Sequence, residues 1–474
     1  MSQRISDRGT FRPRQWSVLL LALALGGCSS MAPPLERPAP PVAASFPGVV
    51  TAAPNLAAAS SVEWQKFFGD ARLKKLIALA LENNRDLRLA LLNIAQARSQ
   101  LDLRRADQWP SVNAGLSASR LPTAAGGISS SYAAGVLVTA YEVDLFGRVR
   151  SLADAALAQY LATEEARKAV QISLLAAVAN GYFALQGDEE LLRVTQQTLL
   201  TREDSYRLIK LRFDKGASSQ IDLRQAQSLL ESARVTLAAA TRQRALDQNA
   251  LVLLLGQSLP NELPPALPIT AAASMPELPI GLPSEVLVRR PDVRQAEQQL
   301  MAANASIGAA RAAFFPRITL TGSLGGASSE LSALFSNGLA WSFAPQLLQP
   351  IFDAGRNQAN LKLSEVNRDI AVAQYERAIQ SAFREVADAL AGRATLGEQL
   401  RAQQAQLAAE QDRHRLAELR YRNGAASYLD VLDAQRSLFT AQQAQVQTQT
   451  QYLQNQVTLY RVLGGGWTDG SAAP

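Results

Sequence analysis

Side chains able to do chemistry are scarce in this sequence. Its 474 residues include one cysteine, Cys28, and one histidine, His414. Enzymes and metal sites need clusters of such groups, and the sequence contains no metal-ligand cluster, Gly-rich phosphate loop or nucleophile motif. His414 lies in a Gln- and Arg-rich helical stretch, which indicates a solvated surface residue. The sequence therefore predicts that the protein is not an enzyme and has neither a metal nor a cofactor.

Cys28 indicates chemistry of a different kind. Residues 1–27 place four arginines before the apolar run WSVLLLALAL, the order of an export signal that is too short to span a membrane. The LGGC motif that ends at Cys28 matches a lipoprotein box, which predicts cleavage before Cys28 and acylation there. A plain secretory signal with an incidental cysteine is the alternative. Ser29 follows where Asp would retain the protein at the inner membrane, so the outer membrane is favoured.

A second group of charged and polar side chains lies in two stretches of the chain that have similar sequences. Residues 212–230 read RFDKGASSQIDLRQAQSLL, and residues 420–438 read RYRNGAASYLDVLDAQRSL. In both, a serine precedes an aspartate by three residues, which is the spacing of a capping box, so Asp430 is predicted to cap a helix. Asp433 lies three residues before Arg436, which permits an ion pair along one helix.

The doubled phrase belongs to a repeat that covers most of the chain. Two halves follow from it, residues 62–257 and 284–464. The repeat is carried by four pairs of positions, each pair 208 residues apart: Gly147-Arg148 and Gly355-Arg356, Gly216 and Gly424, Asp222 and Asp430, and Leu255-Gly256 and Leu463-Gly464.

Each half is predicted to contain the same elements in the same order. A helical stretch ends at a proline, and two runs follow in which apolar and polar residues alternate, as they do in strands. A proline-free stretch then extends over 149–214 or 357–422, long enough for a helix of about 100 Å. After a glycine, a second helix returns. The expected strands are residues 111–121, 132–143, 317–325 and 339–350, and the expected hairpin tips lie near 216 and 424.

The segments outside the halves differ in composition. Residues 28–61 are rich in Pro, Ala and Ser, which predicts an extended tether rather than a folded segment. Residues 258–283 are proline-rich and are expected to form an irregular connector, and residues 465–474 form a C-terminal tail. Removal of residues 1–27 lowers the formal net charge from +6 to about +3, so no nucleic-acid partner is implied.

The strands indicate a membrane barrel that one chain cannot complete. Strands of about ten residues with one apolar face are typical of such barrels, and the smallest bacterial ones have eight strands. Because an open sheet edge cannot stand in lipid, several copies must share a barrel: two copies give eight strands and three give twelve. The helices carry Ala and Gln beside narrow apolar seams, which favours a wall one helix thick, wet on both sides. An ordinary antiparallel coiled coil is the alternative.

Longer phrases make a family resemblance specific. They include VEWQKFFGDARLKKLIALALENNRDLRLA, YEVDLFGRVRS, GLPSEVLVRRPDVRQAE, AAFFPRITLTGSLG, QPIFDAGRNQANL and LYRVLGGGW. On these phrases the chain, from Cys28 to Trp467, resembles the outer-membrane efflux proteins, the TolC-like outer-membrane factors, and within them the OprM/NodT-type lipoprotein branch.

The resemblance implies an α+β membrane protein, a homotrimer whose twelve-stranded β-barrel, with four strands per chain, is continued by a long α-helical barrel. It implies a passive outer-membrane channel of a tripartite efflux pump that exports small organic compounds or drugs. The implied partners are a periplasmic adaptor (membrane fusion) protein and an inner-membrane transporter of the resistance-nodulation-division (RND) type. The helices would lie in the periplasm, and a lipid on Cys28 would anchor the chain. A periplasmic coiled-coil scaffold without a pore and a protein-secretion duct are the alternatives.

The resemblance also implies roles for residues near the second tip. In the family, aspartates just past this tip surround a nearly closed periplasmic gate, and the matching positions are Asp430 and Asp433. In the lipoprotein branch, the hydrogen bonds or ion pairs that close the gate are made at the positions that match Tyr421 and Arg436. Ala426 stands where some members carry an arginine, which leaves Arg436 as the better candidate for the latch.

The two tip glycines have two expected roles that are compatible. Gly216 and Gly424 match the positions that dock against the adaptor. Both also end a helix, where a left-handed residue is needed as a cap.

Overall fold

The computed structural model describes residues 30–47, 62–124, 126–269, 275–276, 278, 289–336 and 338–467. The predicted signal peptide, Cys28, part of the connector 258–283 and most of the C-terminal tail lie outside these residues. The chain divides into two compact units. The described parts of residues 1–39, 93–164 and 295–376 form the first unit, and those of residues 40–92, 165–294 and 377–474 form the second.

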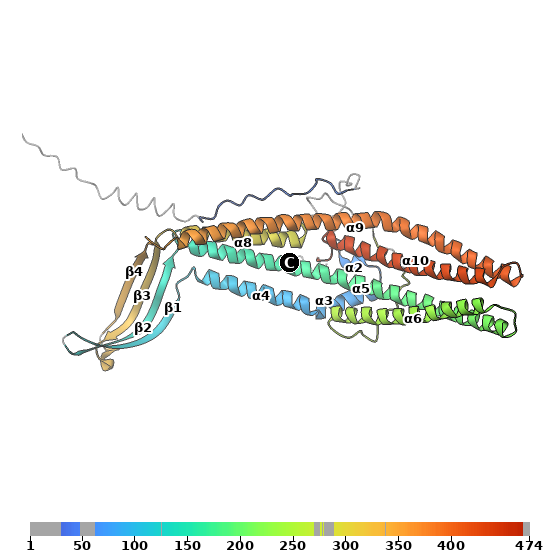
Figure 1. Ribbon diagram of the computed structural model, residues 1–474. Helices are drawn as coiled ribbons and strands as arrows, with labels where there is room; N and C mark the ends of the chain where they lie inside the picture. The colour runs from blue at the N-terminus through green and yellow to red at the C-terminus, as the bar shows by residue number, and fades with distance from the viewer. Residues whose placement is uncertain are drawn as a thin grey trace, which may run out of the picture. The chain divides into compact units, whose positions relative to one another are not determined.

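A four-stranded antiparallel sheet dominates the first unit (Figure 1). Its strands are β1 (Val112–Pro122), β2 (Ile128–Val143), β3 (Arg317–Ser328) and β4 (Ala340–Leu348), in the order β1-β2-β3-β4. The hairpins of the two sequence halves are therefore joined through β2 and β3. Within the chain, β1 and β4 are the two edge strands.

The strand ends differ by a few residues from the expected ones. The largest difference is in β2, which begins at Ile128 instead of 132, because the serines 129–131 pair with residues 119–121 of β1. Serine is common in loops, which is why these residues were expected outside the strand. The hydrogen-bond ladder of a sheet is formed by backbone groups, so it continues through a residue of any type whose backbone N–H is available. Conversely, β4 ends at Leu348, two residues before the expected end.

The sheet has two chemically different faces. Directly paired residues point to the same side of a sheet, and the register places Val136, Leu324 and Trp341 in one row. The side chains of that row are exposed within the chain. The next row on the opposite side contains Ser323 and Ser342, whose hydroxyl oxygens lie 2.7 Å apart. We call these the apolar face and the polar face. The apolar face also carries Val112, Leu116, Val138 and Phe343, and the polar face Asn113, Ser117, Ser119 and Ser131, with Leu137 as an exception.

A bulge in β2 preserves this separation where the sheet meets the helices. The register between β2 and β3 shifts between Val138 and Tyr141, and Ala140 has a φ of 52°. The Ala140 N–H, freed from the ladder, donates to the Thr321 hydroxyl at 3.2 Å. Because the bulge inserts one residue, Tyr141 pairs with Leu320 and remains on the apolar face.

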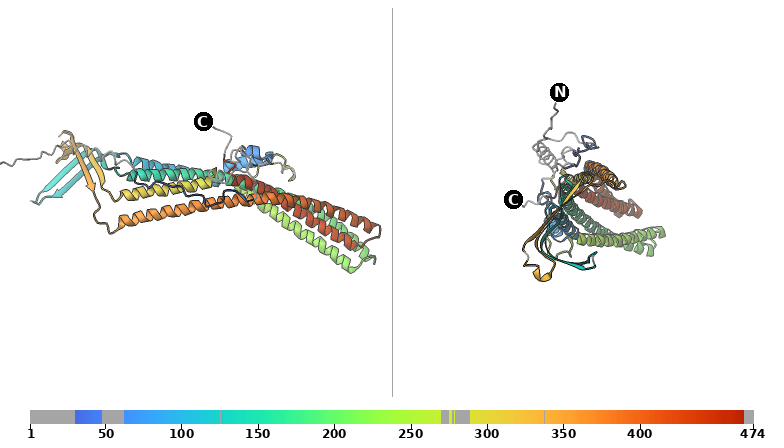
Figure 2. Two further views of the ribbon diagram at one scale, coloured as in Figure 1. Left: turned by 90° about the horizontal axis from the view of Figure 1, so that it is seen from above. Right: turned by 90° about the vertical axis from the view of Figure 1, so that its left-hand side faces the viewer.

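Two helical hairpins supply most of the second unit (Figures 1 and 2). The first joins α5 (Arg148–Asp214) to α6 (Gln220–Leu255), and the second joins α9 (Arg356–Arg422) to α10 (Tyr428–Val462). α5 and α9 have 67 residues each, or about 100 Å. Each turn contains a left-handed glycine, Gly216 with φ 70° and Gly424 with φ 73°. In both turns the next N–H bonds back to a carbonyl five residues earlier at 2.8 Å, as in a Schellman motif.

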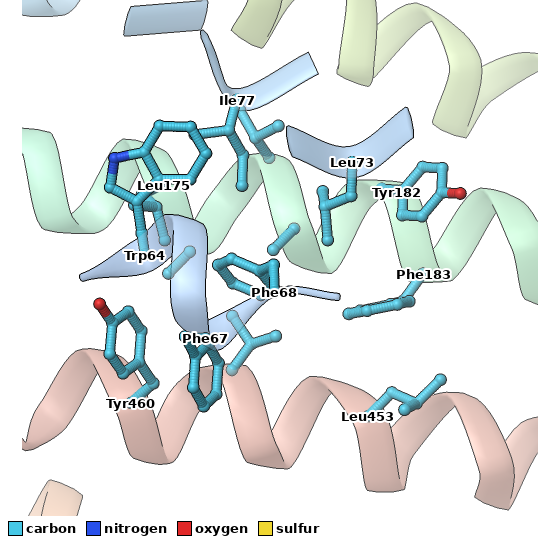
Figure 3. Close-up of a cluster of buried hydrophobic side chains, with 14 of the residues drawn as sticks. Trp64, Phe67, Phe68, Leu73, Ile77, Leu175, Tyr182, Phe183, Leu453 and Tyr460 are labelled. Atoms are coloured by element: carbon cyan, nitrogen blue, oxygen red, sulfur yellow. The ribbon is translucent and has the colours of Figure 1, made fainter. Parts of the chain in front are cut away.

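Shorter helices cover the far ends of these hairpins. They are α2 (Trp64–Phe67), α3 (Ala71–Asn83) and the start of α4 (Arg85–Ala106). A further helix, α8 (Pro291–Ala312), follows Arg290, which donates to the Val462 carbonyl at the end of α10 at 3.2 Å. Figure 3 shows the core that α2, α3 and α4 enclose, where the rings of Phe67 and Tyr460 stack at 4.1 Å. The Tyr460 hydroxyl donates to the Val62 carbonyl at 2.5 Å. α5 contains an apolar stretch long enough to cross a membrane, but most of that stretch is buried inside the protein.

The predicted tether is partly wrong. Residues 30–47 contain no helix or strand, yet Phe46 is 3% exposed and stacks on Phe383 of α9, with the ring centres 5.0 Å apart. The composition of the segment does not reveal this contact, because a single aromatic residue hardly changes the average of a proline-rich segment. Burial of its ring nevertheless fixes the segment at Phe46, whereas a free tether would leave that ring in water.

A carboxyl pair between α5 and α6 makes stability depend on pH. Burial, and then the hydrogen bond to Asp247, raise the pKa of Asp188 to about 7, from an ordinary value of 3.8. Because the folded state binds this proton more tightly than the unfolded state, the contribution of Asp188 to the free energy of unfolding is fully present below pH 4 and is lost as the pH rises through about 7.

The variant Asp188→Asn does not titrate at this position. Its free energy of unfolding, taken relative to that of wild type, should therefore increase by about 1 to 3 kcal/mol per chain between pH 4 and pH 7.5. Thermal unfolding in detergent at both pH values measures it, and an equal difference at both would contradict it.

Candidate gate at the hairpin tips

The two hairpins of one chain meet along an apolar seam near their tips. Ile209 of α5, Ala226 of α6 and Leu432 of α10 form a buried cluster. Tyr206, Leu223, Leu229 and Tyr428 pack around it. This seam sets the position of the α10 side chains that the sequence singles out as gate candidates.

Asp433 lies between two arginines. Its carboxylate accepts a hydrogen bond from Arg436, one turn later on α10, at 2.5 Å. It also accepts one from Arg413 of α9, which holds a second acid, Glu410, at 3.2 Å. The hydrogen bond that Arg413 donates to Asp433 is the main reason why the pKa of Arg413 is raised. Asp433 therefore joins the two helices of the second hairpin.

The sequence interpretation missed Arg413, although a signal for it exists. Gly424 is the turn of an antiparallel hairpin, so residues at similar distances before and after it lie side by side. Arg413 is eleven residues before the glycine and Asp433 is nine after it. Pairing charges across the predicted turn would have found this contact.

Tyr421 makes a different set of contacts from the one expected. The guanidinium of Arg212, from the first hairpin, lies 5.0 Å from the centre of its ring. The ring centre of Tyr428, on α10 of the same hairpin, lies 4.8 Å from the ring centre of Tyr421. The Tyr421 hydroxyl is buried and forms no hydrogen bond with any residue that the structure describes. Tyr421 thus connects the two hairpins, whereas Asp433 and Arg436 act within the second.

The two predicted capping boxes differ. At the first tip Ser219 and Asp222 form the full reciprocal box, and these hydrogen bonds lower the pKa of Asp222. At the second tip Ser427 makes no side-chain cap bond, so the prediction that Asp430 acts as a capping acid is wrong. A second hydroxyl explains the difference: Ser218 also binds Asp222, at 3.1 Å, and Ala426 replaces it at the second tip.

The sequence interpretation also missed a buried arginine on α5, at some distance from the tip. Arg202 is 3% exposed, and its guanidinium donates to the Leu229 carbonyl of α6 at 2.7 Å. It also lies over the ring of Phe439 of α10, 5.1 Å from its centre. Burial lowers its pKa. Nothing in the sequence distinguishes this arginine from the many exposed ones, so only the packing shows that it joins three helices.

Two other predicted residues differ in their surroundings. The expectation that His414 is solvated is wrong, since it is half-buried and its Nε2 atom is enclosed without a partner among the described residues. Gly216 and Gly424 face open space, because a Cβ built on either would meet no described atom within 4 Å. The tips are therefore free surfaces of the chain.

Comparison with known proteins agrees with this geometry. The family model described as outer membrane efflux protein matches residues 76–257 and 282–465. The chain is 47% identical over 462 residues to the probable efflux pump outer membrane protein TtgC of Pseudomonas putida, covering 95% of both chains. It is 46% identical to the outer membrane protein OprJ of Pseudomonas aeruginosa over 462 residues, covering 96% of both.

Solved structures extend the likeness to the fold. The open state of the Neisseria gonorrhoeae MtrE outer membrane channel matches with a TM-score of 0.86 and 41% identity, covering 93% of this chain and 99% of that one. The Campylobacter jejuni CmeC outer membrane channel matches with a TM-score of 0.84 and 26% identity, over 92% and 95% of the two chains.

These likenesses confirm three predictions from the sequence. The fold class is an α+β membrane protein with a trimeric, twelve-stranded barrel, four strands per chain, continued by a helical barrel. The function is that of the outer-membrane channel component of a tripartite efflux pump. The location is the outer membrane, with the helices in the periplasm. The chain belongs to the outer membrane efflux protein family.

Proposed function

We propose that three copies of this chain form a passive, water-filled conduit that carries small organic compounds from the periplasm to the exterior. The two-faced sheet is the observation that supports it most. An apolar outer face and a lumen of small polar side chains suit a pore that lets solutes pass without binding them. Such a conduit performs no catalysis, so the energy comes from the partner transporter.

Three copies close the barrel through the two edge strands. β1 of one chain pairs with β4 of the next, which satisfies the backbone groups that would otherwise be unpaired in lipid. The partners are a periplasmic adaptor, which docks at the open tips around Gly216 and Gly424, and an inner-membrane transporter of the RND type. Cys28 carries the covalent lipid that anchors each chain.

The tips form the gate of this conduit. In the resting state, the bond of Asp433 to Arg413 holds α10 against α9, Arg436 binds the same carboxylate from within α10, and Tyr421 with Arg212 holds the second hairpin against the first. Asp430 is exposed and contributes charge to the entrance rather than a bond. Two unit charges about 8 Å apart in water repel by only about 0.5 kcal/mol, so repulsion between aspartates alone does not open the gate.

Complementation tests the transport role. The relatives include outer membrane proteins of efflux pumps named for toluene, solvents and antibiotics. A bacterial host that lacks its own outer-membrane factors, but keeps a periplasmic adaptor and an RND transporter that are compatible with this chain, should regain tolerance to such compounds when the chain is expressed. Expression without the transporter is the control and should restore nothing. Restored secretion of a protein with no change in tolerance would favour a secretion duct instead.

A further inference from the structure

The turn that joins β3 to β4 has an unusual composition for a loop. We call residues 329–336 the β3–β4 turn (Figure 1). It lies at the end of the sheet opposite to Arg317, where β3 begins, and hence on the exterior side, because the helices lie in the periplasm. Its sequence SELSALFS contains one charged residue, Glu330, whereas Leu331 and Phe335 are 61% and 85% exposed. Since turns that lie in water are normally polar, this composition indicates other surroundings.

The β3–β4 turn folds back onto the apolar face of the sheet. Gly326 belongs to that face, because it is two residues after Leu324 on β3. A Cβ built on Gly326 would lie 2.2 Å from the Leu334 carbonyl oxygen, so the backbone of the turn lies directly over this glycine. Leu334 is 2% exposed, which shows that the turn packs against the sheet. Gly326 pairs with Ala134 of β2, so this contact lies over the two middle strands, away from the edge strands.

Two tyrosines indicate the level at which the turn lies in the membrane. Tyr141 and Tyr132 of β2 both belong to the apolar face, and they pair with Leu320 and Ser328 of β3. The eight residues from one partner to the other extend about 26 Å along the strand, or about 20 Å in height at the usual tilt of membrane strands. Aromatic girdles mark the two borders of the apolar band of a barrel, which is about 25 Å tall. Gly326 is two residues on the membrane side of Ser328, so the turn folds back to a level inside the band.

The backbone of the β3–β4 turn suits an apolar environment. The N–H groups of Ala333, Leu334 and Ser336 each donate to the carbonyl three residues earlier, at 3.2 to 3.3 Å. The Glu330 N–H donates to the Ser328 hydroxyl at 3.1 Å, which keeps the one charged residue of the turn at the level of the outer girdle. Unpaired backbone groups are costly in lipid, so an embedded turn needs internal hydrogen bonds of this kind.

We infer that the β3–β4 turn is a membrane-embedded surface whose Leu331 and Phe335 side chains insert among the acyl chains of the outer leaflet. The exposed Trp341, which pairs with Leu324 on the same face, continues this apolar surface into β4. The turn therefore widens the contact between the barrel and the lipid instead of covering the mouth of the lumen, and a trimer carries three such turns. The inference rests on the outer-membrane location and not on the proposed transport of small compounds.

Spin labelling of the assembled trimer tests this placement. A nitroxide is attached to Phe335→Cys in a Cys28→Ser background, and the trimer is reconstituted in phosphatidylcholine vesicles. Collisions of the label with oxygen, which concentrates among acyl chains, are compared with its collisions with a polar nickel chelate, which stays in water. The oxygen-to-nickel ratio should resemble that of Leu324→Cys and exceed that of Ala124→Cys, in the turn between β1 and β2, by at least about tenfold, because hydrocarbon excludes a polar chelate.

Two other results would overturn the inference. A high rate of collision with nickel at position 335 would place the β3–β4 turn in water. Low rates for both reagents would place it against another part of the trimer, such as a neighbouring copy of the chain.

A matched pair of glycine variants tests the contact that holds the turn. With the label at position 335, Gly326→Ala should displace the turn and lower the oxygen-to-nickel ratio several-fold, because its Cβ would meet the Leu334 carbonyl oxygen at 2.2 Å. Gly322→Ala, on the same strand and face but with its nearest atom at 3.4 Å, should leave the ratio unchanged. Heat-modifiable gel mobility shows whether each variant forms trimers, and if Gly326→Ala does not, the label at position 335 alone decides. An unchanged ratio in trimers of Gly326→Ala would contradict a turn held on the apolar face.

Discussion

The double variant Asp433→Asn, Arg436→Gln should raise the resting conductance of the purified channel in planar bilayers by about ten- to hundredfold. Exposed ion pairs contribute about 0.5 to 1 kcal/mol per chain, which becomes about 1.5 to 3 kcal/mol when three chains open together. Each 1.4 kcal/mol changes the ratio of open to closed channels about tenfold. Folding should not change, because these side chains are partly exposed and the seam around Ile209 remains.

Two matched variants make this result specific. Asp430→Asn removes a carboxylate of the same helix turn that forms no ion pair among the described residues, and should leave conductance unchanged. Arg413→Gln removes the second partner of Asp433 and should raise conductance by part of the full amount. Unchanged conductance in the double variant would remove Asp433 and Arg436 from the latch, and an equal increase from Asp430→Asn would show that only net charge matters.

Leu324→Arg should abolish assembly in the outer membrane, whereas Ser323→Arg should not. An arginine on the lipid face of a barrel costs about 2 to 4 kcal/mol near the middle of the membrane, and a trimer contains three. On the polar face the same side chain remains in water and should lower conductance by narrowing the pore. Heat-modifiable gel mobility of outer-membrane fractions measures assembly, and bilayer recording measures conductance.

The adjacent positions of this pair make the comparison strict. Leu324 and Ser323 belong to the same strand, pair with Trp341 and Ser342 of β4, and differ only in the face to which they point. Assembly of both variants, or failure of both, would contradict the assignment of the faces.

Patterns that repeat over many residues could be read from the sequence. The alternation in RITLTGSLG depends on its own residues, and it predicted a strand at 317–325 where β3 covers Arg317–Ser328. The long stretches without proline predicted helices at 149–214 and 357–422, where α5 and α9 begin one residue earlier. Such elements are set by local periodicity and breakers, which a single sequence contains.

Contacts between distant segments could not be read in the same way. Residues 31–37 lie against α8, where Gly308 leaves space for Ala32, and no local pattern connects these two positions. Arg202 is buried because α6 offers a carbonyl and α10 a ring, which depends on the packing of three helices. Proline-rich composition predicts an extended backbone correctly, but it does not show whether that backbone has a partner.

The central claim is that three chains enclose one water-filled lumen lined by the polar face. Single-channel recording of Ser323→Cys in a Cys28→Ser background, during addition of a charged thiol reagent, tests it most directly. The claim predicts a fall in conductance in three discrete steps, one for each chain, and no response from Leu324→Cys. A response from Leu324→Cys with none from Ser323→Cys would contradict it.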